Sequence, residues 1–393
     1  MSDFGNGKLV QLHILETDGI VEKLFPKEFY IGSGGKALVG GNLEEFTMNG
    51  VKGVFGGICT RIFRRSPNLL KLDLCNQVNV IHPIALIALS TCCTLLQVLI
   101  IPGCNHIENH TFVTLFSKLP CLEELNVNKC ALIEHSCLLV IAGTCPKLKS
   151  LNIGSLNLLD ENVFVILKAI RTLRNVNVSN LTNIIFTFDL SDTSWEHLNL
   201  GGNFILPTFS FPNSLQSLTL SRNTSNECFQ KLPKGLLHLD ASDCVQTPSL
   251  FLKMWPTSLL ELAVPSAFTD ECIPHLPRGL QKLDAHRAIA LTACGINNNL
   301  PPLSTVILPF MRESLDLPET LTVCLMLKKG AWFIQYLKDA ESASKPEHEN
   351  HYWHSACAFH DSGKELPYYF DMIPYKNRNR TFQEVQVEGD VSL

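Results

Sequence analysis

Charged residues are few in this sequence. Of its 393 residues, 18% are Asp, Glu, Lys or Arg, whereas 46% are hydrophobic. A chain with so much apolar surface to bury is not intrinsically disordered. Basic residues do not outnumber acidic ones, at 32 Lys and Arg against 37 Asp and Glu, so nothing in the composition favours binding to a phosphate backbone. We expect a folded protein with no nucleic-acid partner.

A secretory signal is also missing from the first residues, MSDFGNGK, which lack a basic, then apolar, then small-residue layout. The 15 cysteines are odd in number, so they do not all pair as disulfides within the chain. These features predict a cytoplasmic or nuclear protein whose thiols are reduced and buried.

One stretch, from Leu74 to Ile107, contains no Lys, Arg, Asp or Glu, so a membrane span is one interpretation of it. Pro83, Pro102 and Gly103 interrupt this stretch. The repeat register described below explains it better, as a strand, its buried helix and the next strand. We therefore expect no membrane partner.

Motifs that would identify an enzyme are missing as well. The Gly-rich segment 30–37, YIGSGGKA, has no Gly five residues before Gly35, and Ala37 stands where a phosphate-binding loop needs Ser or Thr. Cys92 and Cys93 are adjacent and belong to no Cys-x-x-Cys pair. No Ser/His/Asp arrangement, carboxylate pair or nucleotide motif has supporting local context. The sequence predicts neither catalysis nor a cofactor.

What the sequence has in abundance is one repeated pattern, Leu-x-x-Leu-x-Leu, first clear at residues 69–74. Further copies, some with another apolar residue in place of Leu, lie at 96–101, 122–127, 148–153, 173–178, 195–200, 215–220, 236–241, 259–264, 280–285 and 303–308. Weaker copies begin at Leu9, Leu43 and Leu321. Repetition at such a period is the signature of a solenoid.

The spacing between copies falls into two groups. From Leu69 it runs 27, 26, 26, 25 and 22 residues, then 20, 21, 23, 21 and 23. In the longer repeats, apolar residues with helical spacing follow the pattern, at 59–63, 86–93, 112–119, 138–145 and 163–170, and predict a helix in each. In the shorter repeats, Pro212, Pro233, Pro256 and Pro277 precede the pattern. Proline excludes a helix there and favours turns and short extended or 3₁₀ segments.

Two parts of the chain resemble known leucine-rich repeats. Residues 145–153 match Cys-Pro-x-Leu-x-x-Leu-x-Leu, and a cysteine recurs three residues past the pattern at Cys104, Cys130 and Cys244. On these residues, 54–178 resemble the cysteine-containing repeats of F-box/leucine-rich-repeat proteins. Residues 205–309 are similar to short Leu-Pro-x-x-Leu repeats of the FNIP type. An F-box itself is not evident, because only the fragment at 25–29 is similar to one.

The resemblance and the repeat pattern together predict an α/β solenoid, a leucine-rich-repeat horseshoe. Its parallel strands would form the concave face, and helices would cover the convex face mainly in the N-terminal half. The predicted organisation is an N-terminal cap with imperfect repeats over 1–53, a leucine-rich-repeat domain over 54–327, and a C-terminal cap with a flexible tail over 328–393.

A column of mostly polar residues occupies the strand position between the last two apolar residues of each repeat. One interpretation is that its Asn and Asp residues keep the open sheet soluble and hydrogen-bond along the stack. The other is that the column and its neighbours bind a partner protein. The candidate binding residues are Asn126, Asn152, Asn177, Asn199, Asp240, Asp284, Glu124, Arg174, His197, Arg222 and His238.

Towards the C-terminus, four His and one Cys recur every third residue from His348 to His360. Imidazole and thiolate are suitable zinc or copper ligands, which makes His351, His354, Cys357 and His360 weak metal candidates. The alternative, a solvated or partly packed cap without metal, is our prediction.

We expect a non-enzymatic scaffold that binds another protein through its concave surface. The alternative, implied by the resemblance, is the substrate-recognition subunit of an SCF-type cullin-RING ubiquitin ligase. Its partners would include Skp1-like and cullin-type subunits.

Overall fold

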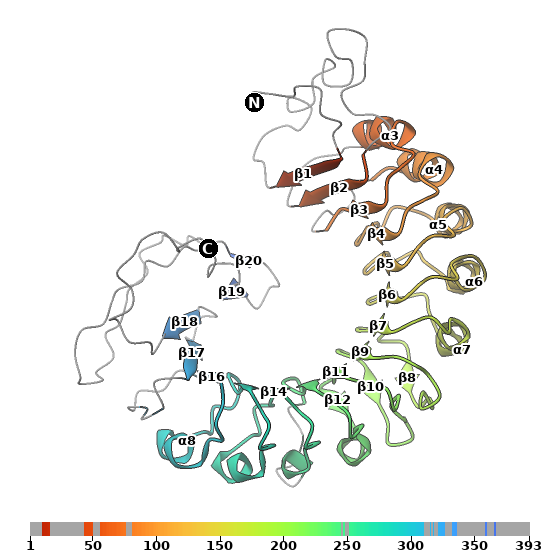
Figure 1. Ribbon diagram of the computed structural model, residues 1–393. Helices are drawn as coiled ribbons and strands as arrows, with labels where there is room; N and C mark the ends of the chain where they lie inside the picture. The colour runs from red at the N-terminus through yellow and green to blue at the C-terminus, as the bar shows by residue number, and fades with distance from the viewer. Residues whose placement is uncertain are drawn as a thin grey trace, which may run out of the picture. The chain divides into compact units, whose positions relative to one another are not determined.

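The chain divides into two compact units, Met1–Gln246 and Thr247–Leu393, which are described separately. The computed structural model describes residues 10–15, 43–49, 56–75, 81–244, 247, 251–309, 315, 317, 321–326, 332–335, 358–359 and 365–366. The first unit holds most of the regular structure (Figure 1).

Parallel strands line the inner side of the first unit. In sheet order they are β1 (Gln11–Leu15), β2 (Glu45–Asn49), β3 (Lys71–Asp73), β4 (Val98–Ile100), β5 (Glu124–Asn126), β6 (Ser150–Asn152), β7 (Asn175–Asn177), β9 (His197–Asn199), β11 (Ser217–Thr219) and β13 (His238–Asp240). Each strand pairs with the next at the same repeat position, so Leu125 lies beside Leu151, and Leu151 beside Val176. The weak copies near Leu9 and Leu43 are therefore true repeats.

The apolar positions of the pattern form the core. In all eleven clear copies these residues are buried, except for Leu303. Within each three-residue strand the middle side chain is buried and its neighbours are more exposed, as in β5 and β6. This alternation is the period of two that a strand imposes. One repeat could not bury its own apolar face, so neighbouring repeats supply the cover.

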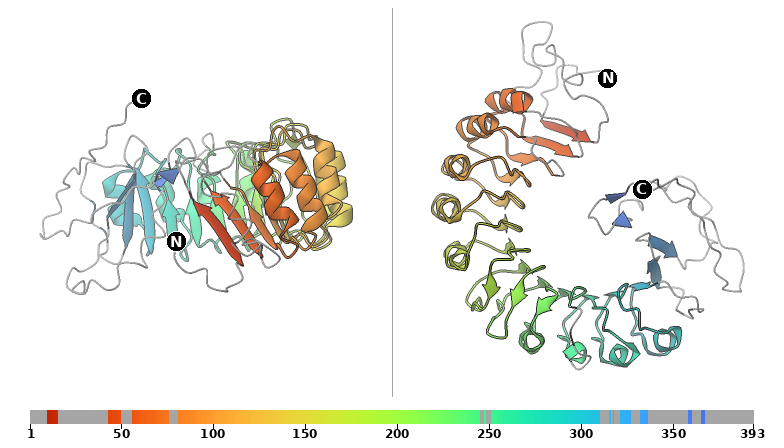
Figure 2. Two further views of the ribbon diagram at one scale, coloured as in Figure 1. Left: turned by 90° about the horizontal axis from the view of Figure 1, so that it is seen from above. Right: turned by 180° about the vertical axis from the view of Figure 1, so that it is seen from behind.

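Five helices cover the outer side of the longer repeats, where their apolar spacing predicts them. They are α3 (Gly56–Arg64), α4 (Pro83–Cys92), α5 (Asn109–Phe116), α6 (His135–Thr144) and α7 (Asn162–Ala169). Consecutive helices pack side by side (Figure 2). Helices of 8 to 10 residues are too short to be stable alone, so burial of residues such as Phe112 and Phe116 maintains them. The charge-free stretch contains α4, which confirms the repeat interpretation.

After α7 the outer side changes to β structure. Three two-residue strands, β8 (Ile185–Phe186), β10 (Phe204–Ile205) and β12 (Asn223–Thr224), form a small parallel sheet, followed by the 3₁₀ helix η1 (Asn226–Lys231). Phe186 packs edge-on against Phe164 of α7, with ring centroids 5.0 Å apart. The sequence predicts short extended and 3₁₀ segments here, but not their assembly into a sheet.

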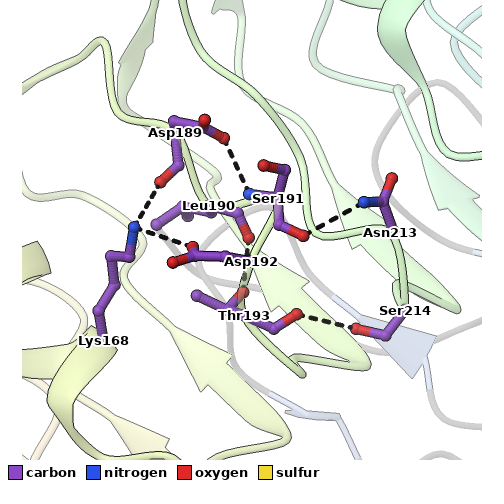
Figure 3. Close-up of polar contacts among 8 residues, drawn as sticks. All are labelled: Lys168, Asp189, Leu190, Ser191, Asp192, Thr193, Asn213 and Ser214. Atoms are coloured by element: carbon purple, nitrogen blue, oxygen red, sulfur yellow. Dashed lines mark hydrogen bonds and ion pairs between the residues drawn. The ribbon is translucent and has the colours of Figure 1, made fainter.

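Polar contacts connect α7 to the segments that replace helices (Figure 3). Lys168 of α7 donates to the carbonyl of Asp189 at 3.0 Å and pairs with the Asp192 carboxylate at 2.9 Å. Asn213, in the following repeat, donates through Nδ2 to the carbonyl of Ser191 at 3.2 Å. The carbonyls of Asp189 and Ser191 are not hydrogen-bonded within a helix, and side-chain donors from neighbouring repeats supply the hydrogen bonds instead.

The second unit continues the strand pattern. β14 (Glu261–Ala263), β15 (Lys282–Asp284), β16 (Thr305–Pro309) and β17 (Thr322–Met326) are parallel, and β18 (Trp332–Gln335) joins β17 antiparallel. β19 (Ala358–Phe359) and β20 (Glu365–Leu366) form a separate antiparallel pair. On the other side of the repeats lie the 3₁₀ helices η2 (Phe251–Lys253) and η3 (Asp270–His275).

One short helix, α8 (Ala293–Asn299), lies where turns and 3₁₀ segments are predicted. Thr292 caps it, because its hydroxyl accepts from the Gly295 N–H at 3.0 Å. Asp270 in turn accepts from the Thr292 hydroxyl at 2.7 Å. The strands, helices and repeat register together establish an α/β leucine-rich-repeat solenoid fold. The predicted domain limits at 53 and 327 remain predictions.

Cysteines form part of the core, and none of the thirteen whose side chains the structure describes is in a disulfide. The recurrent Cys130 and Cys244 are buried behind their turns and donate to carbonyls of the preceding repeat, at 3.3 and 3.2 Å. Burial raises the pKa of the Cys244 thiol to about 12, which keeps it protonated and unreactive. The expectation that the thiols are all buried is wrong at four positions: Cys75, Cys92 and Cys121 are half-buried, and Cys294 is exposed because α8 places it outside the core.

A left-handed residue recurs in the turn after the strand in five consecutive repeats. Gly103, Lys129, Ser155, Asn180 and Gly202 have φ values of 72°, 61°, 59°, 55° and 76°. The first four each donate their backbone N–H to a carbonyl of the next repeat, at 2.7 to 2.9 Å. These bonds between repeats hold a conformation that costs a residue with a Cβ roughly 1–2 kcal/mol.

Ser155→Gly should therefore stabilise the protein by about 0.5–1 kcal/mol. Glycine removes the cost of positive φ, and its larger loss of backbone entropy on folding offsets only part of that gain. Urea unfolding measures the change. The control is Thr182→Gly, at an exposed position without positive φ, which should be neutral or destabilising. Equal effects of the two substitutions would contradict this prediction.

Candidate functional site

A shallow hollow of about 260 Å³ lies on the inner face of the first unit, over β5, β6, β7, β9 and β11. Two columns of side chains, one on each side of the buried middle position, line it. The first column consists of Glu124, Ser150, Asn175, His197 and Ser217, and the second of Asn126, Asn152, Asn177, Asn199 and Thr219. The strand register places each member beside its counterpart in the next repeat. We call this surface the concave hollow.

Four asparagines of the second column, Asn126, Asn152, Asn177 and Asn199, form what we call the amide row. Each accepts a hydrogen bond through Oδ1 from the backbone N–H two residues further on. The four distances are 3.0, 3.1, 3.0 and 2.9 Å. This geometry is an Asx turn, which ends the strand and starts the connection to the outer side.

Aspartates make the same turn elsewhere in the column. Asp73 accepts from Cys75 N–H at 2.9 Å, Asp240 from Ser242 N–H at 3.0 Å, and Asp284 in the second unit from His286 N–H at 3.1 Å. Oδ1 of these residues therefore accepts within its own repeat, whereas one interpretation of the column expects it to hydrogen-bond along the stack. Their residue type is explained by a local structural role.

Glycine appears where the turn approaches the amide row most closely. A Cβ at Gly154 would lie 2.8 Å from the Ser179 hydroxyl and 3.3 Å from Asn152 Oδ1. A Cβ at Gly201 would lie 3.2 Å from Asn199 Oδ1. The turns are thus closely packed, and the asparagine oxygens have little freedom to move.

A row of charges borders the concave hollow on the side where the strands begin. We call Glu123, Lys147, Lys149, Arg174 and Glu196 the charged rim. Lys149 Nζ lies 2.6 Å from the Glu123 carboxylate, and Arg174 Nε 3.5 Å from that of Glu196. A second hollow of about 350 Å³ is lined by three basic residues of the rim, by Glu123, and by Pro146 and Thr172. The hydrogen bond and charge of Lys149 hold the pKa of Glu123 below its ordinary value.

The structure brings together six of the predicted site residues at the concave hollow: Glu124, Asn126, Asn152, Asn177, His197 and Asn199. Arg174 lies on the charged rim. His238 and Asp240 lie on β13. Arg222 is on an exposed turn after β11, so it does not line the hollow. Asp284 belongs to the second unit, where its carboxylate contacts His286 Nδ1 at 2.6 Å.

Ser150, Asn175 and Ser217 were not predicted, although they line the concave hollow. They occupy the first position of their strands, as the predicted Glu124 and His197 do. Their position in the repeat could therefore have identified them from the sequence. Small neutral side chains draw little attention in a sequence, yet here they widen the hollow.

The metal candidates His351, His354, Cys357 and His360 lie outside the described residues. Within the described part of the chain, no three His, Cys, Asp or Glu side chains are grouped so as to hold a metal ion. Among the helices described, none has both the length and the apolar character to cross a membrane.

No protein-family model and no curated protein matches the chain. Solved structures that match include a chain of the yeast Rad7–Elc1 complex, with 18% identity, a TM-score of 0.34, and coverage of 58% of this chain and 81% of that one. Another is the leucine-rich repeat-containing protein LegL7 from Legionella pneumophila, with 13% identity, a TM-score of 0.28, and coverage of 82% and 85%.

Asn152→Ala and Asn177→Ala should each destabilise the protein by about 1 kcal/mol, because the turn N–H loses its acceptor. Asn152→Asp and Asn177→Asp should cost less, since Asp73 and Asp240 make the same turn. Urea unfolding compares the four variants. If alanine and aspartate variants were equally stable, the Asx turns would contribute nothing measurable.

Lys149→Met should raise the pKa of Glu123 towards its ordinary value, because the main cause of its depression is removed. NMR titration of the Glu123 carboxyl measures this. Since the folded pKa is depressed, the pair stabilises the protein above the ordinary carboxyl pKa, and that contribution is lost as pH falls through the lowered pKa. Lys147→Met is the control and should have a smaller effect, so an equal effect of both would contradict the assignment.

Proposed function

We propose that this protein is a non-enzymatic scaffold whose concave hollow binds a segment of another protein. The observation that carries the proposal is the set of ten hollow-lining side chains on five strands in one register. A surface on strands that are bonded to neighbours on both sides is preorganised, so little conformational entropy is lost when a partner binds.

The composition of the concave hollow supports a protein partner over other classes. Apart from His197, none of its lining residues is aromatic, so it offers no platform for stacking sugars or nucleobases. Its shallow, open form lacks the enclosure of a small-molecule pocket. The apolar middle positions Leu125, Leu151, Val176 and Leu198 also line the hollow between the two columns. An apolar centre with a polar surround is typical of protein interfaces.

Ser150→Tyr combined with Ser217→Tyr tests this function. Neither hydroxyl makes a side-chain hydrogen bond within the described part of the chain, so two bulky neutral side chains should block the hollow with little loss of stability. The matched control is Asn157→Tyr with Gln230→Tyr, at exposed positions outside the hollow. Affinity capture with quantitative mass spectrometry compares the three proteins.

We expect partners captured by the wild type and the control to be lost from the Ser→Tyr variant. Retention of the same partners by the blocked variant would place binding elsewhere on the chain. The same capture tests the ligase alternative, because a substrate receptor would bring down Skp1-like and cullin-type subunits from its own cells, and their consistent absence would end that alternative.

A further inference from the structure

In the amide row the oxygens are engaged by the Asx turns and the nitrogens are not, which has a consequence for the kind of partner the concave hollow accepts. A backbone N–H must meet an acceptor, so the Asx turns fix each amide with its oxygen towards the turn. The four Nδ2 groups make no hydrogen bond to any residue that the structure describes, and all four side chains line the hollow. Two N–H donors per residue therefore remain for a ligand.

The donors form a row with defined ends. Parallel strands are about 4.8 Å apart, so the four amides extend over roughly 14 Å. The equivalent strand position is occupied by Ile100 in β4, before the row, and by Thr219 in β11, after it. The asparagine amides therefore stop at both ends. A ligand that satisfies the row must present acceptors along this length and few donors.

A carboxylate fits this requirement best, because an ionised carboxylate accepts hydrogen bonds and donates none. An extended main chain brings one N–H for every carbonyl, so half of its polar groups would find no partner on the row. Hydrogen bonds to charged acceptors are also about twice as strong as those between neutral groups.

Charge on the adjoining rim is complementary to the same ligand. The charged rim has three basic residues, Lys147, Lys149 and Arg174, against two acidic ones, Glu123 and Glu196, which pair with Lys149 and Arg174. Within the concave hollow, Glu124 is the one acidic side chain, and it lies on β5 at the first strand of the hollow. The side chains of a basic segment would meet these cations and the amide N–H groups with no acceptors of their own.

Building on the proposed function, we infer that the concave hollow binds an acidic segment of a partner protein, whose Asp or Glu carboxylates accept hydrogen bonds from Nδ2 of Asn126, Asn152, Asn177 and Asn199. The rim cations attract the segment, and the amide row positions its carboxylates. Specificity comes from the direction of the amides, which the turns impose.

The decisive variant is Asn152→Asp with Asn177→Asp. Aspartate keeps the Asx turn, as Asp240 does with Ser242, but replaces two donors by acceptors at nearly the same volume. The control, Asn157→Asp with Gln230→Glu, adds the same charge at exposed positions outside the hollow. Thermal unfolding of both confirms that the fold is kept.

The experiment selects binders from a random dodecapeptide phage library on the full-length wild-type chain. Peptides that the Ser150→Tyr, Ser217→Tyr variant no longer binds are synthesised and titrated by fluorescence anisotropy. We expect these peptides to be rich in Asp and Glu and to bind the Asn→Asp variant at least about tenfold more weakly, as loss of hydrogen bonds to charged groups implies. The charge control should weaken binding less than threefold.

Hollow-dependent peptides that lack acidic residues, or that bind the Asn→Asp variant as tightly as the wild type, would overturn the inference and leave the proposed function standing. If the charge control weakened peptide binding as much as the Asn→Asp variant does, the added negative charge alone would explain the loss of affinity. That result would also overturn the inference. Binders that all tolerate the Ser→Tyr variant, or no binders at all, would count against the inference and the proposed function together.

Discussion

Backbone hydrogen bonds between consecutive parallel strands determine the spacing of everything else in the first unit. They place Leu125, Leu151 and Val176 in one buried line, and the side chains before and after them in two lines that are more exposed. Because the side-chain period of a strand is two, a slip of one residue would exchange core and surface. The concave hollow is thus a direct product of the register that builds the core.

The asparagines of the concave hollow serve the fold before they serve any ligand. The oxygen of Asn152 accepts from the Gly154 N–H in the turn that follows β6, and the nitrogen remains for the surface. Replacement by a residue without an acceptor would disturb the turn as well as the surface, so loss of binding in such a variant would be ambiguous. Aspartate separates the two roles because it retains the acceptor and changes only the outward group.

The sequence predicts those features that a long period makes visible. The Leu-x-x-Leu-x-Leu pattern predicts the strands, and the helical spacing of Phe112 and Phe116 predicts α5. Both patterns arise because the residues that face the core must be apolar. The small sheet of β8, β10 and β12 escapes, since two-residue strands carry no alternation. The orientation of the Asn152 amide escapes too, because it depends on where the next turn places its N–H. Arg222 is predicted as a sequence neighbour of the column, but it lies on an exposed turn after β11 and does not line the hollow.

The left-handed turns give the first unit a direction. Lys129 donates its N–H to the carbonyl of Gly154, and Ser155 donates to that of Ser179, always from one repeat to the repeat that follows it in the chain. During synthesis on the ribosome, the newest repeat therefore lacks the carbonyl that its own turn requires until the next repeat has emerged. Each of these repeats is completed by its successor, so one left-handed turn without its acceptor remains at the growing end.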